Sequence, residues 1–248
     1  MKFKVHKFQS IDSTNKYALE KADTLENYSV ICARTQSAGK GRKGRKWIST
    51  DGENLYFSLL IRNPAVEVTE ISGIPQLMAL SVYKTLLKAG ILDCWIKWPN
   101  DVFVDDRKIC GILCESRFKG SKIDALVIGV GVNVNASKQS LSTIDIPATS
   151  VLHETGDGDP YDIDQLLHVI LNNFDHSLNE WLQPEKKEKF TEEWRSASRL
   201  IGKPVKLIDD ELEIYGTVAD FSVNGEIILQ TEKGFQRFSY GDISLRVV

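Results

Sequence analysis

Residues 95–116 read WIKWPNDVFVDDRKICGILCES, and this stretch decides the fold class. It holds short apolar, β-rich runs separated by turn residues, which is the pattern of consecutive strands. The pair Asp105-Asp106 is typical of a tight hairpin turn. The expected strands are Trp95–Trp98, Val102–Val104 and Cys110–Ser116, and a further strand is expected over Ala125–Val134.

Working outward, the segments on either side of these strands carry helical patterns. Ser13 is a typical helix N-cap in front of a short helix. Apolar residues recur near helical spacing in several longer segments. The expected longer helices are Val68–Ala89, about Ile163–Leu182 and about Pro184–Ser198. Adjacent strands with separate helices indicate an α+β domain over residues 1–200, with a mixed or antiparallel sheet and flanking helices.

The pattern changes near Leu200. Residues 201–248 contain short strand-like runs only, and turn pairs such as Asn224-Gly225 and Lys233-Gly234 separate them. A run of short strands of this kind is typical of a small β-barrel. We therefore predict a second, C-terminal domain over residues 201–248.

Composition and charge limit the classes of function. The formal net charge is −3, so the protein as a whole does not attract polyanions, and a nucleic-acid partner is not expected. No apolar stretch approaches the length of a membrane-spanning helix, and residues 1–7 do not resemble a secretory signal. A cytoplasmic protein without a membrane partner is the expectation. The four cysteines lack metal-ligand spacing and are interpreted as reduced, buried thiols.

The segment Gly39–Trp47 reads GKGRKGRKW and concentrates positive charge on a mildly acidic chain. Glycines permit tight turns and close approach to a ligand, and the interleaved Lys and Arg side chains suit phosphate or carboxylate. The spacing matches neither a P-loop nor a dinucleotide fingerprint. On composition alone, a solvated basic loop and a nucleic-acid-binding loop remain alternatives.

Three further motifs are candidates for ligand contact. Lys97-Trp98-Pro99-Asn100-Asp101 places a lysine at a strand end beside a turn that Pro99 restrains, although on composition alone an ordinary turn between strands is the better explanation. Ser13-Thr14-Asn15 offers hydroxyl and amide groups, but it is also a common N-cap. Gly129-Val130-Gly131-Val132-Asn133-Val134 has two glycines inside a strand, which indicates close approach of another group or simple crowding.

These motifs, taken together and in this order with Gly111–Glu115 (GILCE), resemble the biotin–protein ligase family over nearly the whole chain. The resemblance implies a catalytic domain like that of class II aminoacyl-tRNA synthetases, followed by a small β-barrel. It also implies that ATP activates biotin to biotinyl-5′-AMP, and that biotin then passes to a lysine of a biotin carboxyl carrier protein of a carboxylase.

The resemblance also implies roles for particular residues. Lys97 and Arg42 would be the catalytic cations. Biotin would be bound by Ser13, Thr14, Asn15, Gln36, Lys40, Gly41, Arg42 and Lys97. ATP would be bound by Arg42, Arg45, Trp47, Asn100 and Asn133. Magnesium would arrive with ATP, and the protein would be a monomer or a homodimer.

The chain departs from the family pattern in two places. The family loop usually has arginine where Lys40 and Lys43 stand, and lysine cannot form the bidentate contacts of arginine. The Ser-Thr-Asn element begins at residue 13, so the DNA-binding domain of many bacterial relatives is not expected here, nor a repressor function. A lipoate or octanoate ligase, a non-enzymatic nucleic-acid-binding protein and an inactive biotin-binding module are the alternatives.

Overall fold

The computed structural model describes residues 1–248 except 51, 157, 210–211, 240–242 and 248. A seven-stranded sheet forms its centre, with strand order β1-β2-β3-β7-β6-β5-β4. Strands β1 and β2 are parallel and all other neighbours are antiparallel. The strands are β1 Lys4–Ile11, β2 Ser29–Gln36, β3 Leu55–Arg62, β4 Cys94–Lys97, β5 Asp101–Val104, β6 Arg107–Lys119 and β7 Lys122–Val132. The predicted mixed sheet is confirmed.

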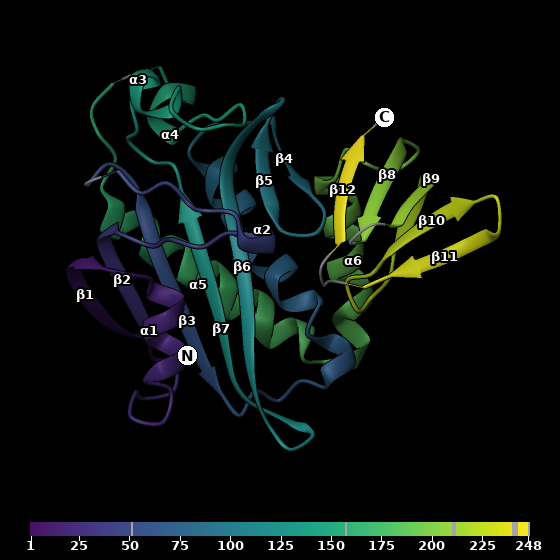
Figure 1. The fold of residues 1–248 in the computed structure, drawn as a ribbon, viewed down its shortest axis with the longest axis horizontal. Coiled ribbons are helices and arrows are strands. Elements are labelled where there is room, and N and C mark those ends of the chain that lie inside the picture. Colours follow the sequence, from purple (N-terminus) through teal and green to yellow (C-terminus); the bar gives the residue numbers. More distant parts are fainter. Residues whose placement is uncertain (51, 157, 210–211, 240–242, 248) are drawn as a thin grey trace.

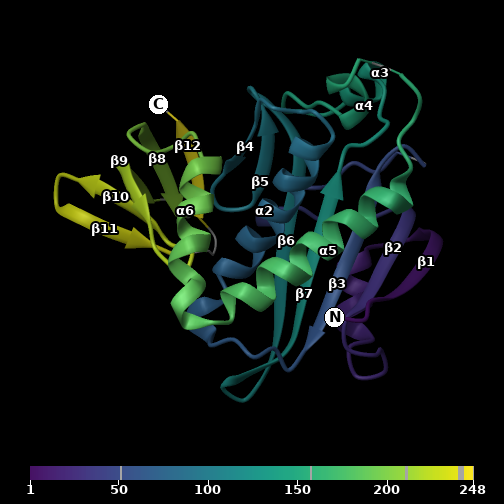
Figure 2. The same ribbon diagram turned by 180° about the vertical axis from the view of Figure 1, so that it is seen from behind.

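Helices cover the two faces of this sheet unequally (Figures 1 and 2). The long helices α2 and α5 pack together against one face, while the short α1 lies on the other face over β3 and β7. The helices are α1 Thr14–Glu20, α2 Gly73–Lys88, α3 Lys138–Leu141, α4 Val151–Glu154, α5 Ile163–Trp181 and α6 Lys187–Ala197. None of those in the described part of the chain has the length and apolar run that a bilayer crossing requires.

Local sequence explains where the helices begin. The Ser13 side chain accepts a hydrogen bond from the Lys16 amide, as expected of an N-cap. The helix expected from Val68 begins later, because Val68–Glu70 forms a 3₁₀ turn and α2 starts at Gly73. Pro75 lacks an amide hydrogen and is tolerated only in a first helical turn, which places the start of the helix just before it.

The C-terminal sheet is antiparallel, with strand order β11-β10-β9-β8-β12. Its strands are β8 Pro204–Asp209, β9 Leu212–Phe221, β10 Ile227–Thr231, β11 Gly234–Phe238 and β12 Ile243–Val247. The chain passes from α6 to this sheet between Ala197 and Pro204, around the predicted boundary at residue 200. Val248, the last residue of the predicted C-terminal domain, lies outside the described residues.

Hydrogen bonds join the second sheet to the first domain at the turn Asn224-Gly225. The indole nitrogen of Trp98 donates to the Gly225 carbonyl at 3.0 Å, and the Ser72 hydroxyl donates to the Asn224 carbonyl at 2.6 Å. Gln76 also donates to the Gly225 carbonyl. A Cβ atom at Gly225 would lie 2.8 Å from the Gln76 side chain, and its φ is +85°, so glycine is required there. The C-terminal domain therefore contacts Trp98 directly.

Candidate active site

A cavity of about 500 Å³ lies on the α1 face of the sheet, over β7, β6 and β5. Its walls are the start of α1, the basic loop between β2 and β3, and residues 144–148. Every residue that the sequence assigned to a ligand lines this cavity except Lys97. Those brought together are Ser13, Thr14, Asn15, Gln36, Lys40, Gly41, Arg42, Arg45, Trp47, Asn100 and Asn133.

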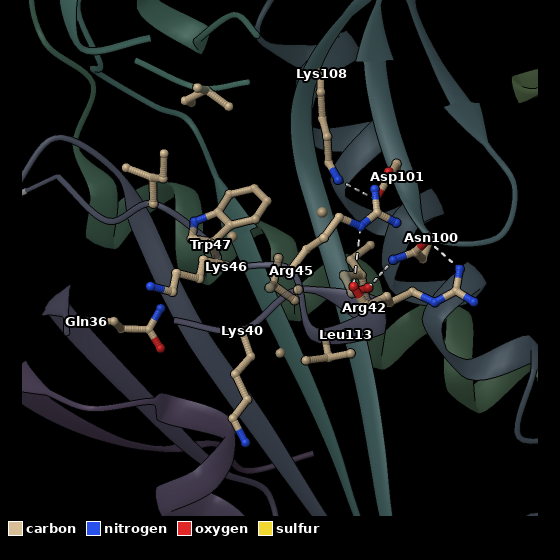
Figure 3. A pocket seen from close by; sticks show the side chains of 18 of the residues that line it. Gln36, Lys40, Arg42, Arg45, Lys46, Trp47, Asn100, Asp101, Lys108 and Leu113 are labelled. Atoms are coloured by element: carbon tan, nitrogen blue, oxygen red, sulfur yellow. Dashed lines mark hydrogen bonds and ion pairs between the residues drawn. The ribbon is translucent and has the colours of Figure 1, made fainter. Parts of the chain in front are cut away.

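One end of the cavity is uncharged and polar. Ser13, Thr14 and Asn15 are at most 4% exposed, and the start of α1 holds them over the sheet. The Thr14 amide and hydroxyl both donate to Oε1 of Gln36, at 2.9 and 3.1 Å. Gln36 and Lys40 lie on this side in Figure 3. Such an end suits a ligand head group with its own amide-like donors and acceptors.

The basic loop folds back on itself above the cavity. Lys40 and Lys46 face each other as an antiparallel bridge, and the Gly41 amide donates to the Arg45 carbonyl at 2.7 Å. Lys43 and Gly44 have φ values of +54° and +70°, which reverse the chain. The loop thus carries several cations into the cavity wall.

Trp47, at the end of this loop, packs directly against the backbone of two glycines of the sheet. A Cβ atom at Gly131 would lie 2.4 Å from the Trp47 ring, and one at Gly111 would lie 2.8 Å from it. Gly111 and Gly131 are paired across β6 and β7, so they form one bare patch on the sheet. The buried Trp47 indole nitrogen has no hydrogen-bond partner among the described residues. The bare patch therefore seats the Trp47 indole against the sheet, and Trp47 lines the cavity from there.

The other end of the cavity is positively charged. Its cations contact two consecutive residues, Asn100 and Asp101. Arg42 donates to the Asn100 side-chain oxygen at 3.3 Å, and the Lys108 ammonium lies 2.8 Å from an Asp101 carboxylate oxygen. Figure 3 shows these side chains together, across Trp47 from Gln36. The Lys108 ammonium also lies 5.6 Å from the centre of the Trp47 ring. The two consecutive residues Asn100 and Asp101 thus each hold one cation.

Lys108 was not among the residues proposed from the sequence, and a β-bulge explains why. Strict alternation from Gly111, which faces Trp47, would direct Lys108 to the core side of β6. The register between β5 and β6 shifts between Val102 and Phe103, so that Lys108 pairs with Phe103. The extra residue returns Lys108 to the cavity face. Residues 144–148 were also missed, since they carry no periodic pattern and reach the cavity only through the fold.

Lys97 lies on the same face of the sheet, beside the cationic end of the cavity. It pairs with Asp101 across β4 and β5, and β4 is the edge strand, so Lys97 is one strand farther out than Asp101. Its ammonium lies 5.3 Å from the centre of the Phe103 ring. Burial lowers the pKa of Lys97, and the positive charges of Lys108, Arg246 and Arg45 lower it further, against the opposing effect of Asp101. Lys108 therefore joins Lys97 and Arg42 as a candidate cation at this end of the cavity.

The fold and the cavity define an enzyme-like site in which a polar pocket adjoins a cluster of cations. Comparison with known proteins identifies the class: residues 7–133 match the biotin/lipoate A/B protein ligase family. The chain belongs to this family. Residues 200–246 match the biotin protein ligase C-terminal domain, which sets the chain beside the biotin protein ligases within it.

Individual relatives agree with this assignment. The chain is 31% identical to the bifunctional ligase/repressor BirA of Escherichia coli, over 95% of this chain and 72% of that protein. It is 30% identical to the biotin–[acetyl-CoA-carboxylase] ligase of Paracoccus denitrificans, over 91% of this chain and 93% of that one. The biotin protein ligase of Aquifex aeolicus, solved with biotin and ATP, superposes with a TM-score of 0.83 at 29% identity, covering 99% of each chain.

Proposed function

We propose that the cavity of this biotin protein ligase holds biotin and ATP side by side and joins them as biotinyl-5′-AMP. The observation that carries the proposal is the meeting of two cations from different elements at one end of the cavity. Arg42 comes from the loop and Lys108 from a central strand, and both line the cavity. The polar residues at the other end, Ser13, Thr14 and Gln36, are proposed to bind the head group of biotin.

The first step requires two anions to approach each other. The biotin carboxylate attacks the α-phosphorus of ATP, a P–O bond forms, and the bond to the departing pyrophosphate breaks. Cations lower this barrier when they face the charge that develops in the transition state. A unit charge pair at 4 Å contributes about 1 kcal/mol in water and about 4 kcal/mol at an effective dielectric near 20. Lys97, Lys108 and Arg42 are proposed for this role. Lys108 and Arg42 line the cavity, and Lys97 is partly buried beside them.

Magnesium is proposed to enter on the phosphates of ATP, where it would share the neutralisation of charge. The described residues contain no group of three or more His, Cys, Asp or Glu side chains that could hold a metal ion. The Asp101 carboxylate lines the cavity at its cationic end, and it is paired with Lys108. The chain's own contribution to this step is therefore assigned to its cations.

The second step needs the adenylate to survive until the acceptor arrives. The basic loop is proposed to cover it, and Trp47 to lie against the nucleotide, with its unpartnered N–H available as a donor. An acceptor lysine amine then attacks the acyl carbon, the bond to AMP breaks, and the amine loses a proton. No covalent enzyme intermediate is required.

The acceptor, the location and the assembly are proposed from the family. A biotin carboxyl carrier protein or domain is the proposed acceptor, and the cytoplasm is the proposed location. A monomer or a homodimer is expected. No membrane partner and no nucleic-acid partner are expected, and these remain predictions from the sequence.

Exchange of labelled pyrophosphate into ATP tests the activity directly. We expect exchange that depends on biotin and that lipoate or octanoate does not replace. Transfer is then measured by mixing the enzyme with a carrier domain and detecting the biotinylated lysine. Exchange with lipoate alone would refute the biotin assignment, and salt-sensitive DNA binding without any exchange would refute the enzyme.

A further inference from the structure

The side-chain amide of Asn15 is fully engaged by protein groups, although it lines the cavity. Its nitrogen donates to a Glu115 carboxylate oxygen at 2.7 Å and to the Leu113 carbonyl at 3.2 Å. Its oxygen accepts from the Ser58 hydroxyl at 2.5 Å. An asparagine amide has two donor hydrogens, so no donor is left for a ligand.

Asn15 is also held sterically by the sheet beneath it. A Cβ atom at Gly129 would lie 2.1 Å from the Asn15 side-chain oxygen, so only glycine leaves room for this amide. Gly129 pairs with Ser58 on β3 and with Leu113 on β6. Three neighbouring strands therefore form a fitted socket for the first turn of α1.

The same network continues into the polar end of the cavity. The Ser58 hydroxyl, which is completely buried, lies 2.7 Å from the Thr14 hydroxyl. Thr14 in turn directs two donors at Oε1 of Gln36. The Gln36 amino group consequently points away from Thr14, on the cavity side (Figure 3). The single Ser58 hydroxyl hydrogen goes to Asn15 or to Thr14 but not to both at once, and these close contacts together pack the polar groups at this end of the cavity.

We propose that Glu115 and Ser58 are positioning residues for recognition of the biotin head group, and that they act through Asn15. Neither residue lines the cavity, so their effect passes through the groups that do. Asn15, assigned to biotin from the sequence, serves in this proposal as the anchor that fixes Ser13 and Thr14 over the sheet. The inference rests on the proposed function, because it names how that site selects its ligand.

If the contacts of Asn15 with Glu115 or Ser58 are removed, we expect a selective loss of affinity for biotin. Glu115→Ala removes a charge-assisted hydrogen bond and is expected to raise the Kd for biotin about tenfold or more. Glu115→Gln keeps an acceptor oxygen toward Asn15, and it should restore most of the affinity. Ser58→Ala should resemble Glu115→Ala, since it removes the donor to the opposite side of the same amide.

The experiment compares biotin binding by calorimetry with the KM for ATP in pyrophosphate exchange. Ser116→Ala is the matched control, because it alters the neighbouring position of β6, whose side chain faces the opposite side of the sheet. We expect a raised Kd for biotin and an unchanged KM for ATP in Glu115→Ala and Ser58→Ala, with both constants unchanged in the control. Thermal unfolding of each variant shows whether the fold is intact.

Two outcomes would overturn the proposal. One is an unchanged Kd for biotin in Glu115→Ala. The other is an equal loss of biotin and ATP affinity, which would indicate general loosening of the sheet instead of a positioning role. Failure of the unaltered protein to bind biotin at all would refute the proposed function, and that result is distinguishable from both.

Discussion

The ammonium of Lys108 lies 2.8 Å from the carboxylate of Asp101, across the bulged pairing of β6 with β5. Both side chains are largely buried, with 17% and 25% of their surface exposed. The preceding residue, Asn100, accepts a hydrogen bond from Arg42 of the basic loop. The adjacent residues Asn100 and Asp101 therefore hold Arg42 of the basic loop and Lys108 of β6 at the same end of the cavity. This arrangement is the physical basis of the proposed adenylation site.

Substitution of Gly131 by alanine tests whether the bare patch serves the nucleotide. The new methyl group would lie within 2.4 Å of the Trp47 ring and must displace it. Overpacking of this kind costs about 1–3 kcal/mol, so we expect the KM for ATP to rise about tenfold while the Kd for biotin changes little. Gly158→Ala is the control, because no atom lies within 4 Å of a Cβ there. An unaltered KM for ATP in Gly131→Ala would remove the patch from the nucleotide site.

Arg42→Ala tests whether the loop retains the adenylate. Loss of a charge-assisted contact to phosphate should speed the release of biotinyl-5′-AMP about tenfold. The released adenylate is measured by the biotinylation of a free amine or an unrelated protein added to the reaction. Lys43→Ala provides the comparison, since the Lys43 ammonium is directed to the Ile208 carbonyl of β8. Equal release from the two variants would contradict a specific role for Arg42.

The lowered pKa of Lys97 makes a prediction about stability. Its folded-state pKa lies below the ordinary value of 10.5, mainly because of burial, so protonated Lys97 opposes folding. This opposition is complete below the folded-state pKa and vanishes as the pH rises past 10.5. Lys97→Met should therefore be more stable than the unaltered protein at pH 7, and the difference should shrink toward pH 10. Urea unfolding at several pH values measures it, and a difference that grows with pH would contradict the assignment.

Much of the fold and site could be predicted because the signals are local. The strand pairs around Asp105-Asp106, the N-cap at Ser13 and the basic loop each occupy a few consecutive residues. The glycines in β7 indicated close approach, and the structure shows that Trp47 and Asn15 are the groups that approach.

The remaining features depend on pairing between distant segments. Lys108 reaches the cavity only because of the β-bulge between β5 and β6, and no short stretch of sequence predicts that bulge. Lys97 was proposed because it ends a strand beside a restrained turn, and its catalytic role stays a prediction. The sheet order, which places it on the edge strand β4, could not be read from that local pattern. The contact of Trp98 with Gly225 joins segments far apart in the chain, so the sequence offered no sign of it.

The need for Lys108 and Lys97 in adenylation is the most direct test of the account. Pyrophosphate exchange should be measured for Lys108→Ala and Lys97→Ala side by side, with thermal unfolding as a check of folding. Loss of a preorganised cation facing the transition state costs about 10²–10³-fold in rate, and we expect this loss in Lys108→Ala. Lys97→Ala, at the position that the family resemblance assigns to catalysis, is expected to lose activity to a similar degree. Near-normal exchange in either variant would contradict the proposal that these cations drive adenylation.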